Sequence, residues 1–201
     1  MIAIIDYDAG NIMSVQNALK KLGAQTILTR DENVLLSADK VILPGVGSFG
    51  DCMDNINKYN LVEVIRKVVD KGIPFLGVCL GMQLMFEESE ESPGVKGLGL
   101  LEGKIKLIPE GEYKKIPHMG WNSLFYKREG KLFKGIPDNS YVYFVHSYYL
   151  DAKDKTIVVG TTEYNVSIDA TVEKDNIFGC QFHPEKSSDV GIKILENFVN
   201  L

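Results

Sequence analysis

A cysteine lies between two glycines in the segment GVCLG at 77–81, directly after the apolar run 74–78. Small residues two positions either side of a nucleophile are typical of a sharp strand-to-helix turn, which leaves no room for larger ones. The start of the following helix lowers the pKa of a thiol and stabilises the thiolate. The spacing predicts Cys79 as a nucleophile and the Leu80 N–H as one oxyanion donor. The alternative is a buried cysteine among glycines needed for close packing.

A histidine follows a second apolar run, in QFHPE at 181–185. A thiolate nucleophile needs a group that holds its proton and gives it to the leaving amine, and an imidazole does this near neutral pH. Glu185, past a rigid proline, is placed to fix the tautomer of His183. We therefore expect Cys79, His183 and Glu185 to act together. The alternatives are a structural histidine and a metal site, and we expect no metal because no His or Cys residues stand at ligand spacing.

Glycines also fill the loop PGVGSFG at 44–50, after the apolar run 40–43. Such a loop turns backbone N–H groups towards a ligand without a Cβ clash. No Gly-Lys-Ser/Thr sequence follows, which disfavours a nucleotide site, and we expect no cofactor. At the carboxyl ends of parallel strands this loop faces the Cys79 turn, so Val46 or Gly47 is the candidate for the second oxyanion donor. A simple tight turn is the alternative.

The motifs PGVGSFG, GVCLGMQ and QFHPEKS, in this order along nearly the whole chain, resemble the class I (triad-type) glutamine amidotransferase family. Within it, further stretches resemble the glutaminase subunits of imidazole glycerol phosphate synthase: IIDYDAGN at 4–11, FEESEE at 86–91, PHMGWN at 117–122 and FVHSYY at 144–149. The last two favour this subfamily over the amidotransferases for GMP, anthranilate, carbamoyl phosphate, CTP or pyridoxal phosphate. Asp8 and Cys180 depart from the pattern, which has a small residue such as Gly at the first position and Val or Thr at the second.

The resemblance implies an enzyme that hydrolyses the side-chain amide of L-glutamine to glutamate and ammonia through a thioester on Cys79. It implies that the ammonia passes to a separate cyclase subunit with a (β/α)₈ barrel, which makes imidazole glycerol phosphate and AICAR in histidine biosynthesis. The two subunits would form a heterodimer. The residues it places around the glutamine are Gly47, Gln83, Glu91, Ser147 and Tyr148. The partner contacts that we expect at the mouth of the site are Asn11, Met119 and Trp121.

These assignments have plainer alternatives. The glutamate run at 87–91 is more often a solvated face, the aromatic run at 141–149 is typical of strand packing, and a single Trp is as often a core residue. A catalytically silent binding module on the same fold is the alternative to an enzyme. The intact set of Cys79, His183 and Glu185 argues against silence.

The elements that must position these residues change along the chain. Short apolar runs separated by helical patterns indicate parallel strands buried on both faces, at 2–6, 25–29, 40–43 and 74–78. Helical patterns are centred on Val15 to Leu22, on Leu61 to Val69 and on Gln83 to Glu87.

The second half is richer in Val, Ile, Tyr, Phe and Thr and predicts strands at 102–108, 121–126, 141–150, 156–163, 168–173 and 177–182. A turn at Asp175-Asn176 predicts an antiparallel hairpin. A last helix is expected at about 188–200, with Val190, Ile194, Leu195 and Phe198 facing the core. The prediction is one α/β domain over residues 1–201, a doubly wound, mostly parallel sheet with a strand-rich, partly antiparallel C-terminal half.

Composition narrows the class of protein. The 201 residues carry 22 Lys and Arg against 27 Asp and Glu, a net charge of −5, and are 45% hydrophobic, as in ordinary globular proteins. The acidic balance argues against a nucleic-acid partner. No apolar run approaches the roughly 20 residues of a spanning helix, and the N-terminus lacks a signal-peptide pattern. Three cysteines without CxxC spacing fit a reducing compartment, so we expect a cytoplasmic protein without a membrane partner.

Overall fold

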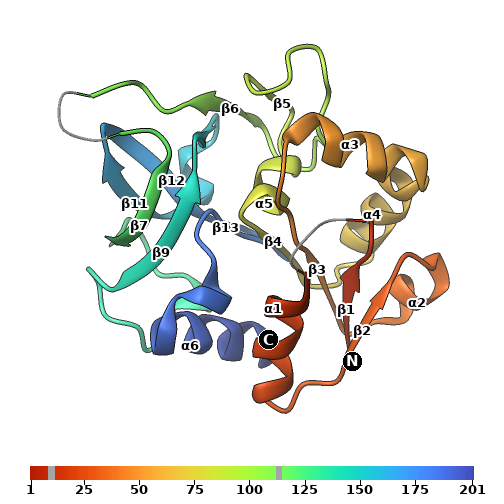
Figure 1. The fold of residues 1–201 in the computed structure, drawn as a ribbon. Helices are drawn as coiled ribbons and strands as arrows, with labels where there is room; N and C mark the ends of the chain where they lie inside the picture. The colour runs from red at the N-terminus through yellow and green to blue at the C-terminus, as the bar shows by residue number, and fades with distance from the viewer. Residues whose placement is uncertain (9–11, 112–114) are drawn as a thin grey trace.

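The computed structural model describes residues 1–8, 12–111 and 115–201, and an eight-stranded sheet runs through its centre (Figure 1). The first five strands in spatial order pair in parallel, and the last three are antiparallel. In that order they are β2 (Thr26–Thr29), β1 (Ile2–Ile5), β3 (Lys40–Leu43), β4 (Phe75–Val78), β13 (Ile177–Cys180), β12 (Val166–Lys174), β11 (Val158–Tyr164) and β8 (Phe125–Tyr126). The predicted α/β class is confirmed, and so is the antiparallel hairpin of β12 and β13.

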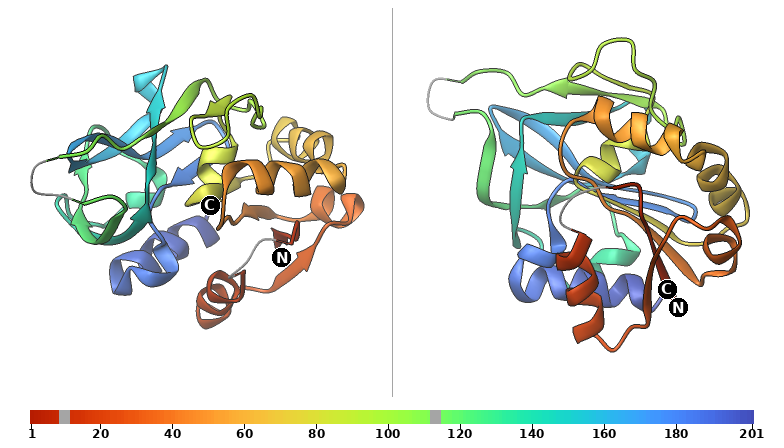
Figure 2. Two further views of the ribbon diagram at one scale, coloured as in Figure 1. Left: turned by 45° about the horizontal axis from the view of Figure 1, so that its top comes forward. Right: turned by 45° about the vertical axis from the view of Figure 1, so that its right-hand side comes forward.

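Helices cover both faces of this sheet, as the views in Figure 2 show. On one face α1 (Ile12–Lys21) and α6 (Ser188–Val199) pack in a cluster that includes Ile4 and Leu76. On the other face α2 (Glu32–Ser37), α3 (Phe49–Lys58), α4 (Leu61–Asp70) and α5 (Leu80–Leu84) pack in a cluster that includes Ile5 and Phe75. Successive strand residues therefore enter opposite clusters, which is why these strands are apolar throughout.

Several boundaries differ from the sequence prediction. Helices α2 and α3 were not expected, because their stretches are rich in polar residues, and each is begun by a side-chain cap from Asp31 or Ser48. Helix α5 ends at Leu84, so it does not reach Glu87. In the last helix Val190 is only half-buried.

Two smaller sheets lie beside the large one and divide the predicted strand 141–150 between them. One pairs β7 (His118–Ser123) with β9 (Tyr141–His146), antiparallel. The other has the order β10 (Tyr148–Ala152), β6 (Gly103–Leu107) and β5 (Glu88–Ser89). The chain passes from one sheet to the other at Ser147, between β9 and β10. The 3₁₀ helices are η1 (Lys131–Phe133), η2 (Lys155–Ile157) and η3 (Pro184–Lys186).

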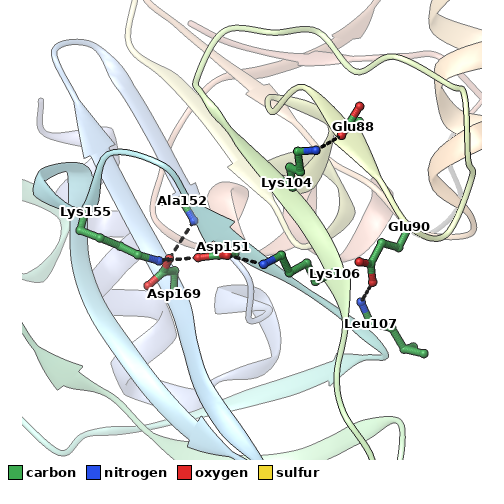
Figure 3. Close-up of polar contacts among 9 residues, drawn as sticks. All are labelled: Glu88, Glu90, Lys104, Lys106, Leu107, Asp151, Ala152, Lys155 and Asp169. Atoms are coloured by element: carbon green, nitrogen blue, oxygen red, sulfur yellow. Dashed lines mark hydrogen bonds and ion pairs between the residues drawn. The ribbon is translucent and has the colours of Figure 1, made fainter.

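Ion pairs join β10 to β6 within the smaller sheet and fasten β10 to the rest of the molecule (Figure 3). Asp151 on β10 accepts from Lys106 of β6 and from Lys155, both at 2.7 Å. Lys155 also binds Asp169 of β12, whose carboxylate accepts the Ala152 N–H at 2.9 Å. These contacts hold β10, and with it the start of that strand at Tyr148, in a fixed place against the central sheet.

Among the described residues, no helix is long and apolar enough to cross a membrane.

Candidate active site

Cys79 occupies a strained turn between β4 and α5. Its backbone has φ 53° and ψ −115°, a conformation that costs a non-glycine residue about 1–3 kcal/mol and is concentrated at functional sites. A Cβ on Gly77 would lie 2.7 Å from the Met82 Cα, and one on Gly81 would lie 2.0 Å from the Leu43 carbonyl oxygen. The two flanking glycines are therefore required by the turn, as the sequence spacing predicts.

His183 and Glu185 lie just after β13, the neighbour of β4 in the sheet. The Nδ1 atom of His183 is 2.8 Å from Oε1 of Glu185, and both side chains are almost fully buried. Burial alone would lower the pKa of His183, but hydrogen bonds that the ring donates to the Cys79 sulfur and the Glu185 carboxylate raise it to about 9. The imidazole thus holds a proton at neutral pH between a sulfur and a carboxylate, which suits it to protonate a leaving amine.

The loop after β3 lies against the Cys79 turn. A Cβ on Gly45 would be 2.4 Å from the Gly81 nitrogen, so the two backbones are in direct contact. The Pro44 carbonyl accepts from the buried Tyr7 hydroxyl at 2.6 Å, and the Val46 carbonyl accepts from the Cys52 thiol at 3.5 Å. The carbonyl groups on either side of the Gly45–Val46 peptide bond therefore both accept hydrogen bonds from buried side chains.

A cavity of about 420 Å³ opens between these segments. Nine of the residues singled out in the sequence line it: Val46, Gly47, Cys79, Leu80, Gln83, Glu91, Ser147, Tyr148 and His183. Glu185 does not line the cavity, but its carboxylate is hydrogen-bonded to His183, which does. The sequence reasoning missed Pro117, Val145, His146 and Lys186, which also line it. Each of these four residues lies inside one of the motifs already noted, and this position was the signal in the sequence that could have identified them.

The amide of Gln83 has a defined direction. Its Nε2 donates to the Tyr148 carbonyl at 2.9 Å and to Oε1 of Gln181 at 2.8 Å, which uses both N–H bonds. Gln83 therefore offers the cavity its carbonyl oxygen, an acceptor. That group suits an ammonium or amide N–H of a ligand.

Glu91 brings a carboxylate to the same cavity. Its Oε2 accepts the N–H of Phe49, the first residue of α3, at 2.8 Å. This bond ties the glutamate run to the loop that precedes α3. A carboxylate placed here suits the ammonium group of an amino acid.

Two of the three residues predicted at the partner surface are exposed on β7, and the third is not described. Asn11 lies outside the described residues. Met119 and Trp121 lie on β7 with 62% and 52% of their surface exposed, so Trp121 is not a core residue. Its ring lies edge-on to Tyr143 at 6.0 Å.

The two departures from the family pattern have local explanations. Cys180 is fully buried, and burial raises the pKa of its thiol to about 12, which makes it a poor nucleophile. Asp8 has a positive φ of 63°, and its carboxylate accepts from Tyr59 at 2.5 Å and from Arg30 at 3.0 Å. Asp8 is thus anchored in a backbone conformation that glycine adopts freely.

Comparisons with known proteins identify the family. Residues 3–201 match the model of the glutamine amidotransferase class-I family. The chain is 51% identical over 201 residues to the imidazole glycerol phosphate synthase subunit HisH of Methanocaldococcus jannaschii, covering 100% of both chains. It is 50% identical over 200 residues to the protein of that name from Moorella thermoacetica, covering 100% of this chain and 94% of that relative.

Solved structures share the fold. A glutamine amidotransferase crystal structure superposes with a TM-score of 0.76 at 19% identity, covering 99% of this chain and 100% of the other. A second glutamine amidotransferase, from Thermotoga maritima, gives a TM-score of 0.66 at 18% identity, covering 99% of this chain and 82% of the other.

Proposed function

The chain belongs to the class I glutamine amidotransferase family, and we propose that it is the glutaminase subunit of an imidazole glycerol phosphate synthase. The full-length identity to two subunits of that name supports this assignment. We propose further that residues 1–201 form one amidotransferase domain. The observation that carries the proposal is the strained Cys79 turn beside the buried His183–Glu185 pair, in a cavity with the acceptors Gln83 and Glu91.

The proposed reaction begins when the Cys79 thiolate attacks the side-chain amide carbon of glutamine. The oxyanion accepts from the Leu80 N–H and from an N–H of Val46 or Gly47. His183 gives its proton to the amide nitrogen, the C–N bond breaks, and ammonia leaves a thioester on Cys79. A water molecule, its proton taken by His183, then hydrolyses the thioester to glutamate and restores the thiolate. Glu185 keeps the imidazole in the orientation that both steps need.

Substrate binding follows from the acceptors and donors around the cavity. The carboxylate of Glu91 and the Oε1 atom of Gln83 suit the α-ammonium group of glutamine. Ser147 and Tyr148, at the junction of β9 and β10, are proposed to hold its carboxylate end.

The proposed partner is a cyclase, a (β/α)₈ barrel that uses the ammonia to make imidazole glycerol phosphate and AICAR. Ammonia must stay unprotonated to attack, which favours a closed passage between the two chains over release into water. The exposed Met119 and Trp121 on β7, near Pro117 and Val145 of the cavity lining, support docking over the mouth of the site. We propose a cytoplasmic location, which the three free cysteines support.

Labelling with a glutamine-analogue electrophile tests the enzyme directly. We expect one adduct, on Cys79, that excess L-glutamine prevents. Cys52 and Cys180 are internal controls because both are buried and burial raises the pKa of each thiol. A catalytically silent binding module would leave Cys79 unmodified, and co-purification with a synthase other than the cyclase would redirect the choice of partner.

A further inference from the structure

Two histidines that take no part in the proposed chemistry lie in contact, and one of them, His146, lines the cavity. Nδ1 of His118 on β7 is 3.0 Å from Nε2 of His146 on β9, and both residues are buried. They pair directly across the β7–β9 sheet. A buried imidazole pair is held by hydrogen bonds of fixed direction, so the direction of each bond can be derived from its neighbours.

The direction starts at the Tyr148 carbonyl, which can only accept. Nδ1 of His146 lies 2.8 Å from that oxygen and must carry the proton. Burial, and to a smaller extent the charge of His183, lower the pKa of His146 to about 4 against the opposing bond to Tyr148. The ring is therefore neutral near pH 7, and its Nε2 is an acceptor.

The remaining bonds follow in the same sense. Because Nε2 of His146 accepts, Nδ1 of His118 donates to it. Nε2 of His118 then accepts from the Asn122 amide at 3.3 Å, and that amide also donates to the Glu163 carbonyl at 3.1 Å. Asn122, His118 and His146 thus form one directed series that ends at the Tyr148 carbonyl.

Ring packing prevents this series from rearranging freely. The His118 ring is stacked between Phe144 and Tyr164, with centroid distances of 4.6 and 4.0 Å. Only 2% of His118 is exposed. A ring held on both faces keeps its two nitrogens aimed at their partners.

The Tyr148 carbonyl connects the series to the substrate site. It accepts from His146 and also from the Gln83 amide, so both of its lone pairs are used. The second N–H of Gln83 donates to Gln181, whose own amide lies 3.9 Å from the Cys79 sulfur. The orientation of the Gln83 amide, and hence the acceptor it shows to the cavity, depends on where this carbonyl points.

We propose that His118 and His146 are positioning residues that hold the Tyr148 carbonyl, and through it the Gln83 amide, in the orientation that binds the glutamine ammonium group. This role rests on the proposed glutaminase function. It also gives one physical reason for two of the sequence motifs, since PHMGWN supplies His118 and Asn122 and FVHSYY supplies His146 and Tyr148. On β7 these inward residues alternate with the exposed Met119 and Trp121, so the strand offered to the partner also carries the series.

Two substitutions of His146 separate positioning from simple packing. In His146→Asn the amide nitrogen replaces Nδ1 and keeps the donor to Tyr148, whereas His146→Gln places its amide near the Nε2 position and loses it. With the chain co-expressed with the cyclase, we expect His146→Gln to raise KM for glutamine about tenfold with little change in kcat. His146→Asn should stay within about threefold of the unmodified chain. Equal KM values for the two variants would overturn the proposal.

The tautomers can be read without any substitution, which keeps the proposal testable if His146→Gln fails to fold. Heteronuclear NMR of the imidazole nitrogens should find His146 neutral and protonated on Nδ1, and His118 protonated on Nδ1. A His146 protonated on Nε2 would contradict the series. A properly folded unmodified complex that shows these tautomers but hydrolyses no glutamine would instead contradict the proposed function.

Discussion

Two glycine-bearing turns lie side by side at the carboxyl ends of neighbouring strands: residues 77–81 at the end of β4 and residues 44–48 after β3. They differ in how they are held. In the first, both glycines are crowded by backbone atoms closer than 3 Å to any added Cβ. In the second, Gly45 is equally crowded, but Gly47 has φ 103° and open space around its missing Cβ.

The difference separates two tasks of the proposed active site. Close packing of backbone fixes the nucleophile, and such packing has no alternative arrangement of similar energy. In the second turn only Gly45 is packed in this way. Beyond it, the Val46 carbonyl is held by a single hydrogen bond from the Cys52 thiol, and Gly47 has open space around it. We therefore expect the chemistry to reside in the first turn. We expect the second turn to respond when the cyclase and its nucleotide substrate bind, by rotating a peptide so that the N–H of Val46 or Gly47 faces the oxyanion.

The largest effect is expected at the fixed turn. Cys79→Ser should reduce glutamine hydrolysis below about a hundredth of its original rate, because a hydroxyl is a far weaker nucleophile without a dedicated base. The fold should remain, and the complex should still use added ammonia. Steady-state assays with glutamine and with ammonium salt measure both. If Cys79→Ser hydrolysed glutamine faster than this limit, Cys79 would not be the nucleophile.

The two partners of the nucleophile should rank unequally. His183→Ala should cost several orders of magnitude because the proton donor is lost, whereas Glu185→Gln should cost less because Glu185 orients the ring. Turnover of purified complexes, with the extent of Cys79 labelling as a check on the cavity, measures this. Small and equal losses would count against the triad.

The increase in turnover caused by the partner should be the next largest effect, and we expect it to depend on the second turn. We expect the isolated chain to be a poor glutaminase and the cyclase with its nucleotide to raise turnover about 10²- to 10³-fold, the value of one oxyanion donor. Turnover is measured for the chain alone, with cyclase, and with cyclase plus nucleotide. A fully active isolated chain would contradict the expected response of the second turn and leave the Cys79 chemistry untouched.

Matched alanine substitutions compare the packing of the two turns. Gly81→Ala forces a Cβ against the Leu43 carbonyl and should lower the melting temperature strongly. Gly47→Ala meets no atom within 4 Å and should cost only the backbone strain of positive φ, about 1–2 kcal/mol. Calorimetric unfolding of both variants measures the difference. Similar melting temperatures would mean that the first turn is as adaptable as the second.

The smallest effect is expected at Cys52. Cys52→Ala removes the bond to the Val46 carbonyl and should raise turnover of the isolated chain about threefold, because a weak hydrogen bond no longer restrains the loop. Cys52→Ser keeps a donor and is the matched control. If the two variants have the same unstimulated turnover, the thiol does not restrain the loop.

The sequence by itself determined the parts that depend on local spacing. The glycines around Cys79, the proline between His183 and Glu185 and the uniformly apolar strands each reflect a constraint that acts within a few residues of chain. The apolar helix faces of α1, α4 and α6 were predicted for the same reason. Helix α3 was missed because its sequence, FGDCMDNINK, contains few strong helix formers and depends on the Ser48 cap and on burial of one face.

Only the tertiary structure decided which distant segments meet. Strand β13 lies parallel to β4, which brings His183 beside Cys79 from more than a hundred residues away in the chain. No turn or local pattern encodes that pairing, because parallel neighbours are joined through long connections. The direction of the Gln83 amide was likewise outside the sequence. An amide has a donor and an acceptor end, and its orientation is set by the Tyr148 carbonyl and Gln181, which only the folded chain brings to it.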